Sequence, residues 1–261
     1  MTGGASCTNC GETLAGRYCH ACGQDSIPPE TALASWHGHW QRLWRTLYAL
    51  VLRPGLLTRE HLSGGRVRFI APFTLFLNIV TIFFLFSVVT EFRLQSFVNK
   101  DSTNHIDRAI ERRAREAGVD RRVFLERAER RFQGVYTVCL ATISLAGYTL
   151  LFRLFFRRQW QGFRGPFTLA LHYLAFVFLV FPFFMAGVSA WARAGPVVLA
   201  NAFGLAVTFC LATAWLALAS RCLFAERWPW AVGKGAAIVF VGFFLDNAMF
   251  LAALILTLNL T

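Results

Sequence analysis

The stretch GAAIVFVGFFLDNAMFLAALILTL, residues 235–258, decides the fold class because it is apolar except at Asp246, Asn247 and Thr257. Crossing a hydrocarbon core about 30 Å thick takes roughly 20 apolar residues of α-helix, at a rise of about 1.5 Å per residue. Stretches of comparable length and composition occur at residues 69–90, 135–156, 167–191 and 197–219. We therefore expect an all-α, polytopic membrane protein with about five transmembrane helices.

The overall composition also indicates a membrane protein. Of 261 residues, 56% are hydrophobic and 15% are charged, which leaves too little polar side-chain surface for a soluble globule of this size. The net charge of +12 is compatible with nucleic-acid binding, but the sequence has no known nucleic-acid-binding motif and no basic stripe on a soluble domain. We assign the charge to loops that face anionic lipid, so we expect the lipid bilayer as a partner and no nucleic acid.

The expected topology depends on the first residues of the chain. Residues 1–10, MTGGASCTNC, lack the basic start and apolar segment of a signal peptide, and strongly apolar sequence begins near residue 69. We expect the N-terminus in the cytosol and, with an odd number of spans, the C-terminus outside. The positive-inside rule adds little, because Lys and Arg are almost equally frequent in the inner and outer loops of this arrangement.

Two Cys-x-x-Cys pairs lie in the sequence CTNCGETLAGRYCHAC, residues 7–22. Thiols stay reduced in the cytosol, so closely spaced pairs there indicate metal ligands before disulfides. Four thiolates complete the tetrahedral shell of Zn²⁺ and leave no open position, which predicts a structural site. An iron centre and a redox dithiol pair are the alternatives. We expect a four-cysteine zinc ribbon over residues 1–26 whose ligands are Cys7, Cys10, Cys19 and Cys22.

Residues 27–68 are expected to form a linker and amphipathic helices. In residues 34–52 one apolar stripe has helical spacing, formed by Trp36, Trp40, Leu43, Trp44, Leu47 and Val51. This helix either lies in the headgroup plane or packs against the inner face of the bundle. The arginines that follow either bind lipid phosphates or serve as ordinary cytosolic anchors, and they are Arg53, Arg59, Arg66 and Arg68.

Residues 69–261 are expected to form the transmembrane domain, with one long charged loop at residues 91–133. Acidic and basic residues alternate along this loop, and partial apolar stripes break near Gly118, which predicts one or two charged helices. We expect these helices to cap the outer ends of the bundle. A helix that docks a partner is the alternative.

Polar residues inside the apolar stretches are candidates for a site. Asp246 falls in the middle of the fifth span, where a carboxylate costs about 2.5 to 3.5 kcal/mol to insert. It is expected to face the bundle, where it could form a polar pocket or proton relay with residues of other helices, namely His172, Asn78 and Asn201. In the alternative interpretation, Asp246 bonds to one neighbouring helix and only holds the bundle together.

Three segments together resemble a family of bacterial membrane proteins described as domain of unknown function thirty-six sixty-seven. They are YCHACGQ, TLYALVLRPGLLTREHLSGGRVRFIAPF and LALHYLAFVF. The resemblance implies an N-terminal zinc ribbon on a helical membrane domain in the bacterial cytoplasmic membrane. It implies no settled activity.

The functional hypothesis from the sequence is an interaction or assembly module whose cytosolic zinc ribbon docks a protein partner. The alternative is a small-solute or proton-coupled transporter with a polar site around Asp246 and His172. An intramembrane enzyme is less favoured, because no Gly-x-Ser-x-Gly, Walker or His-Glu-x-x-His motif occurs, and we identify no catalytic residue.

Overall fold

The computed structural model describes residues 6–7, 10–23, 32–64, 68–89, 105–194 and 197–260. The chain divides into two compact units, Met1–Arg45 and Thr46–Thr261. Across the described residues, the regular secondary structure is helical apart from isolated bridge residues at Ser6, which pairs with Thr13, and at Tyr18. The all-α prediction is confirmed for these residues.

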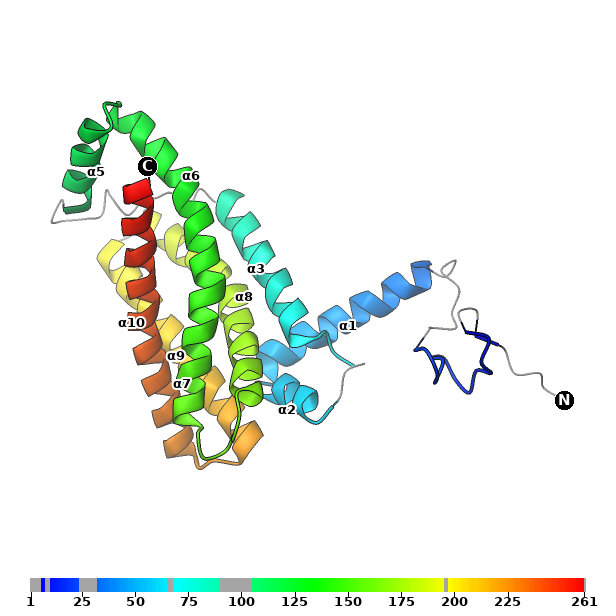
Figure 1. Cartoon of the computed structure of the whole chain (residues 1–261). Coiled ribbons are helices and arrows are strands. Elements are labelled where there is room, and N and C mark those ends of the chain that lie inside the picture. The colour runs from blue at the N-terminus through cyan, green and yellow to red at the C-terminus, as the bar shows by residue number, and fades with distance from the viewer. Residues whose placement is uncertain are drawn as a thin grey trace. The chain divides into compact units, whose positions relative to one another are not determined.

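Figure 1 shows the order of the helices along the chain. α1 begins in the first unit and ends in the second, and α6, the π-helical turn η2 and α7 follow without a break. The helices are α1 (Ala32–Leu52), α2 (Leu56–Leu62), α3 (Pro72–Val89), α5 (His105–Glu116), α6 (Arg121–Cys139), η2 (Leu140–Ser144), α7 (Leu145–Phe155), α8 (Arg164–Ala194), α9 (Val197–Phe224) and α10 (Trp228–Leu260).

Three helices are long and apolar enough to cross a membrane, over Arg164–Phe184, Phe203–Phe224 and Trp228–Asn259. The other two predicted spans, 69–90 and 135–156, correspond to shorter apolar helices at Pro72–Leu85 and Thr142–Phe155. The described residues therefore contain three candidate membrane spans and two shorter apolar helices.

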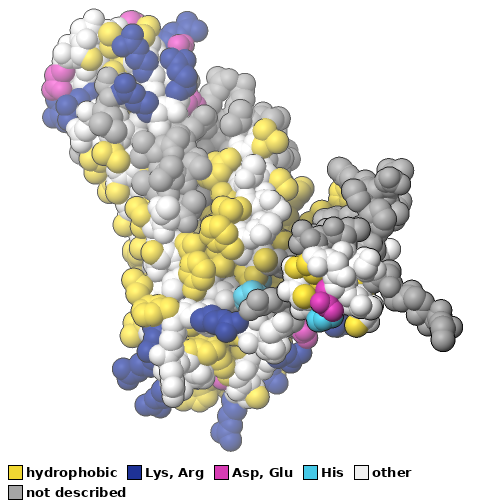
Figure 2. Space-filling model, turned by 45° about the vertical axis from the view of Figure 1, so that its right-hand side comes forward, with side chains coloured by type: hydrophobic (Ala, Val, Ile, Leu, Met, Phe, Trp, Pro, Cys, Tyr) yellow, Lys and Arg dark blue, Asp and Glu magenta, His cyan; other side chains and the backbone are white. Residues whose placement is uncertain are grey.

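α8 is the central helix of the second unit. Its candidate span is 61% buried, against 39% for α9 and 33% for α10. Aromatic side chains fill the space around it: the ring centroids of Tyr173 and Phe152 are 5.7 Å apart, and those of Phe176 and Trp215 are 5.3 Å apart. On the face shown in Figure 2, hydrophobic side chains cover the middle of this unit and Lys and Arg gather at its two ends.

The last turns of α1 pack on this bundle, and so does α2. The Trp215 indole on α9 donates a hydrogen bond of 2.7 Å to the Leu50 carbonyl, and the Ile70 N–H donates one of 3.2 Å to Thr46 Oγ1. The buried side chains of this end are Thr46, Ala49 and Leu50. The predicted stripe lies to one side of this face: Leu47 and Val51 are half-buried, Trp40 and Trp44 are exposed, and the Trp36 side chain lies outside the described residues.

The charged segment forms a hairpin of α5 and α6 that breaks at Gly118, where φ is +64°. Its apolar side packs on the last turns of α10 in a small cluster that includes Ile110, Phe124, Phe132, Ala253 and Leu254. Arg113 donates a hydrogen bond to Asn259 at the same end. The hairpin thus covers one end of α10 and leaves its charged side exposed.

Candidate functional site

The two Cys-x-x-Cys pairs adopt the same local turn. The Gly11 N–H donates to the Cys7 carbonyl at 2.9 Å, and the Gly23 N–H donates to the Cys19 carbonyl at 2.8 Å. Both glycines have positive φ, at +77° and +75°, a conformation that costs other residues energy. The glycine after each pair therefore permits the turn that brings its two sulfurs to one side.

The four Sγ atoms of Cys7, Cys10, Cys19 and Cys22 lie within 4.8 Å of one another. Two of the Sγ–Sγ distances, Cys7–Cys22 and Cys10–Cys19, are 3.6 Å. A tetrahedral site with Zn–S bonds of about 2.3 Å separates its sulfurs by roughly 3.8 Å, whereas a disulfide holds them about 2.05 Å apart. The spacing and the donor type fit a four-thiolate metal site.

The neighbouring thiols affect the ionisation of Cys10. The backbone N–H of Glu12 favours the Cys10 thiolate, but the thiols of Cys22 and Cys19 outweigh it and raise the pKa of Cys10 from 9.0 to about 12. A divalent cation among the four sulfurs would reverse this effect, because it stabilises the thiolates. Without a cation the Cys10 thiol is therefore largely protonated at neutral pH, and with one the four sulfurs could act as ligands.

The ribbon has almost no apolar core. Among its described residues only Cys7 and Cys19 are buried, at 4% and 3% exposure. A segment this small does not gain enough free energy from apolar burial to fold, so a bound metal would have to supply it. A site closed by four protein ligands gives the ion a structural role and no position for a substrate.

Asp246, in the second unit, accepts two hydrogen bonds from α7 and the turn before it. Tyr148 Oη lies 2.8 Å from one carboxylate oxygen, and Ser144 Oγ lies 3.3 Å from the other. Ser144 is the last residue of η2, and π-helical turns of this kind are frequent at functional sites. The carboxylate is thus bound by one neighbouring helical segment, as the interhelical interpretation expects.

A close approach of α10 and α7 permits this contact. A Cβ at Gly242 would clash with the hydroxyl of Tyr148, and one at Gly147 would clash with a methyl group of Leu245. Glycine at 242 therefore leaves room for the tyrosine ring, and glycine at 147 leaves room for Leu245. Sequence reasoning missed Tyr148 and Ser144, although two hydroxyl residues four apart in an apolar helix are a usable signal.

Replacing Tyr148 with Phe is expected to lower the free energy of unfolding by about 1 kcal/mol, because it removes one buried interhelical hydrogen bond. Denaturation by SDS in mixed micelles would measure this change. Tyr48→Phe is the matched control, since Tyr48 is 54% exposed, and it should have no measurable effect. Equal effects of the two substitutions would contradict the structural role of the Tyr148–Asp246 bond.

His172 is buried elsewhere in the bundle, at 2% exposure. Its Nδ1 lies 2.8 Å from Thr58 Oγ1 on α2, and no hydrogen bond joins it to Asp246 within the part of the chain that the structure describes. Of the other polar candidates, Asn78 is exposed and the Asn201 side chain lies outside the described residues. The described polar candidates therefore lie at separate places instead of around one pocket.

The segment from the second half of α1 to α3 carries the family resemblance. Residues 41–84 match the family Protein of unknown function (DUF3667). The resemblance expected from the sequence is confirmed over this segment. The curated proteins and the solved structures gave no match to the chain.

The DUF3667 segment contains the arginines predicted to contact lipid phosphates. Arg53, Arg59 and Arg68 are exposed, and Arg66 lies outside the described residues. The guanidinium of Arg53 lies 5.9 Å from the ring centre of Tyr48, and that of Arg68 lies 5.3 Å from the ring centre of Phe69. Both side chains therefore lie against aromatic rings and keep their charge at the surface.

Proposed function

We propose that this chain is a five-helix protein of a bacterial cytoplasmic membrane whose zinc ribbon lies in the cytosol and docks a protein partner. The observation that carries the proposal is the group of four cysteine sulfurs within 4.8 Å of one another. A structural ion holds a small segment rigid without giving it a reaction to catalyse. Binding is the role left for such a segment, and we assign no catalytic residue.

The lengths of the two shorter apolar helices support five spans. α3 has 18 residues, which at 1.5 Å each extend about 27 Å, close to the thickness of a hydrocarbon core. α7 is extended by η2 and by the end of α6, so the continuous helical rod is longer than its apolar part. With five spans, the charged α5–α6 hairpin and the C-terminus lie on the side opposite the N-terminus.

The described surface of the ribbon offers an aromatic side chain for a partner. Tyr18 lies between the two cysteine pairs and is 49% exposed, and the Arg17 guanidinium lies 5.3 Å from its ring centre. Tyr and Arg are enriched at the centres of protein interfaces. We assign this pair to the docking surface.

A photo-crosslinking residue at position 18, in the full chain in living cells, tests the docking proposal. We expect a cross-link to a discrete partner that disappears when Cys7 and Cys10 are replaced by Ser, because the surface is lost with the fold. The same residue at Val123, exposed on α6, is the matched control and should not capture that partner. Cross-links only within the chain, or a product that survives the cysteine substitutions, would contradict recruitment.

A proton-coupled transporter is the second candidate, and the carboxylate of Asp246 favours it. Asp246 is the single acidic residue in the apolar helices of the described chain, and its carboxylate contacts two hydroxyl groups. Asp246→Asn is expected to reduce proton uptake by proteoliposomes at least tenfold, with unchanged protein accumulation, if this carboxylate carries protons. Unchanged uptake, or a loss of folded protein instead, would contradict the transporter.

A further inference from the structure

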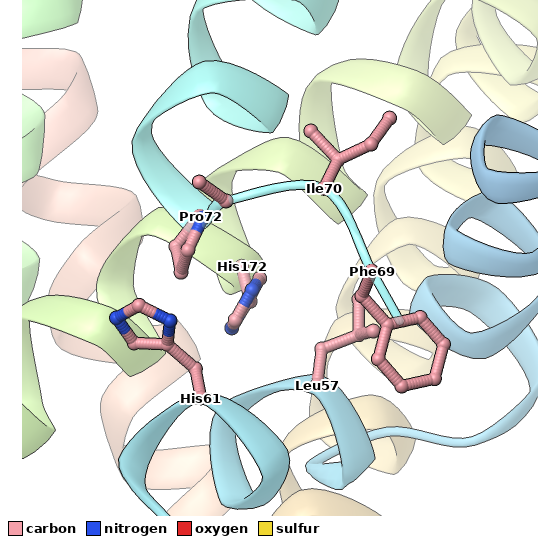
Figure 3. A pocket seen from close by; sticks show the side chains of 7 residues that line it. Leu57, His61, Phe69, Ile70, Pro72 and His172 are labelled. Carbon is pink, nitrogen blue, oxygen red and sulfur yellow. The ribbon is translucent and has the colours of Figure 1, made fainter. Parts of the chain in front are cut away.

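A small cavity lies where α2 and the connection to α3 meet α8. It has a volume of about 100 Å³ and is lined by Leu57, His61, Phe69, Ile70, Ala71, Pro72 and His172. Figure 3 shows the imidazoles of His61, from α2, and His172, from α8, among the side chains that line it. Apart from His172, every lining residue belongs to the matched DUF3667 segment.

Thr58 determines which nitrogen of His172 carries the proton. Thr58 is fully buried, and its hydroxyl has one hydrogen-bond partner within the described chain, His172 Nδ1. A buried hydroxyl that does not donate costs about 1 to 3 kcal/mol, so Thr58 donates and Nδ1 accepts. A neutral imidazole that accepts at Nδ1 is protonated at Nε2, and this N–H has no partner in the described part of the chain.

The lining of the cavity is otherwise apolar and has a cation beside it. Leu57, Phe69 and Pro72 provide its hydrocarbon surface, and the Arg68 guanidinium lies 5.3 Å from the ring centre of Phe69. A ligand that satisfies such a site has oxygen acceptors with negative charge and an apolar part beside them. A cavity of about 100 Å³ holds several water-sized groups, enough for a phosphate and too few for a whole lipid.

The position of the cavity along α3 indicates the source of such a group. Pro72 lines the cavity and is the first residue of α3, whose length of about 27 Å equals that of a hydrocarbon core. A helix of this length that spans the bilayer begins at the boundary between acyl chains and headgroups. With α3 spanning the bilayer as proposed above, the cavity lies at the depth of lipid phosphates.

We propose that this cavity binds the phosphate group of an anionic phospholipid. His172 Nε2–H donates to a phosphate oxygen, His61 provides a second imidazole, and Arg68 adds positive charge beside the cavity. The proposal rests on the membrane insertion of α3 and is independent of partner recruitment by the ribbon, so the two can fail separately.

Native mass spectrometry of the full-length protein in detergent micelles containing phosphatidylglycerol tests the proposal. We expect the wild-type protein to retain phosphatidylglycerol. The apparent affinity for this lipid should fall about tenfold or more in His172→Phe and in Arg68→Gln, because each substitution removes about one charge-assisted hydrogen bond. Arg158→Gln is the matched control, because Arg158 is also exposed, does not line the cavity and is not among the arginines predicted to contact lipid phosphates. It should change the affinity less than twofold.

Two further measurements keep the test decisive. His61→Gln changes a half-buried residue, so it replaces His172→Phe in the test if that variant does not fold. It should also weaken the retention of phosphatidylglycerol. Displacement of the lipid by millimolar inorganic phosphate would overturn the lipid assignment, because the free anion would then be the ligand. Equal retention by the wild type, Arg68→Gln and His61→Gln would overturn the site itself.

Discussion

Replacing Cys7 and Cys10 with Ser is expected to reduce the zinc content of the purified protein from about one ion per chain to almost none. Two thiolates cannot hold the ion as four do, and a structural zinc site contributes about 10 to 16 kcal/mol of apparent binding free energy. Among the described residues of the ribbon, Cys7 and Cys19 are the buried ones, so apolar burial contributes little to its stability. The fold of the ribbon should therefore be lost with the metal. Elemental analysis and limited proteolysis between residues 11 and 18 would measure the two effects.

The matched control replaces Cys210 and Cys222 with Ser. These cysteines lie on α9, far in sequence from the ribbon, and are exposed and half-buried. The control should keep about one zinc ion per chain, since it leaves all four proposed ligands in place. Iron in place of zinc, or full zinc content after the loss of Cys7 and Cys10, would contradict the proposed centre.

Gly55→Ala is expected to destabilise the second unit by about 2 to 4 kcal/mol. Gly55 has a φ of +86°, which disfavours any residue with a Cβ, and a Cβ there would lie 2.9 Å from the Ala219 carbonyl oxygen and 3.0 Å from Ala219 Cα. Those atoms are backbone of α9 and cannot rotate away, so α2 would have to move off the bundle. Thermal unfolding of the purified protein in detergent would measure the loss.

Gly64→Ala separates the two causes of this effect. Gly64 also has a positive φ, +96°, but a Cβ there would meet no atom within 4 Å. Its replacement should cost only the conformational penalty of about 1 to 2 kcal/mol. If Gly55→Ala cost no more than Gly64→Ala, the close packing of α2 against α9 would be wrong.

Local sequence patterns were enough to predict that the four cysteine sulfurs lie close together. Cysteine spacing fixes which sulfurs can approach, and Gly11 and Gly23 fall where the turns need positive φ. These interactions lie within a few residues of chain. The burial of Asp246 against another helix also follows from the cost of a carboxylate in lipid.

The partners of the polar residues could not be predicted in the same way. His172 pairs with Thr58, which is 114 residues away, and Asp246 pairs with Tyr148, which is 98 residues away. Such pairs depend on how each helix is rotated and on which helices are neighbours, and hydrophobicity gives only weak information about either in an almost uniformly apolar helix. The sequence grouped His172 with Asp246 because both are polar residues in apolar helices. It gave no information on how those helices are rotated or which of them are neighbours.

Hydropathy marked the apolar span at 135–156 without marking where its helix begins. The predicted span at 135–156 is the apolar end of a helical rod that begins at Arg121, because backbone hydrogen bonding continues from polar α6 through η2 into α7. Hydropathy distinguishes lipid from water along such a rod, but it does not mark where the helix starts. The apolar stripe of α1 was an incomplete guide to burial, since Thr46 and Ala49 form part of the buried face while Leu47 and Val51 are half-buried.

The central claim is that the four-cysteine ribbon lies on the cytosolic side of a membrane-embedded helical bundle. Its most direct test uses a variant with Cys139, Cys210 and Cys222 replaced by Ala, so that only the four ribbon thiols remain. After metal chelation, a membrane-impermeant maleimide should label this variant in permeabilised cells and leave it unlabelled in intact cells. Labelling of the four thiols in intact cells would contradict the account.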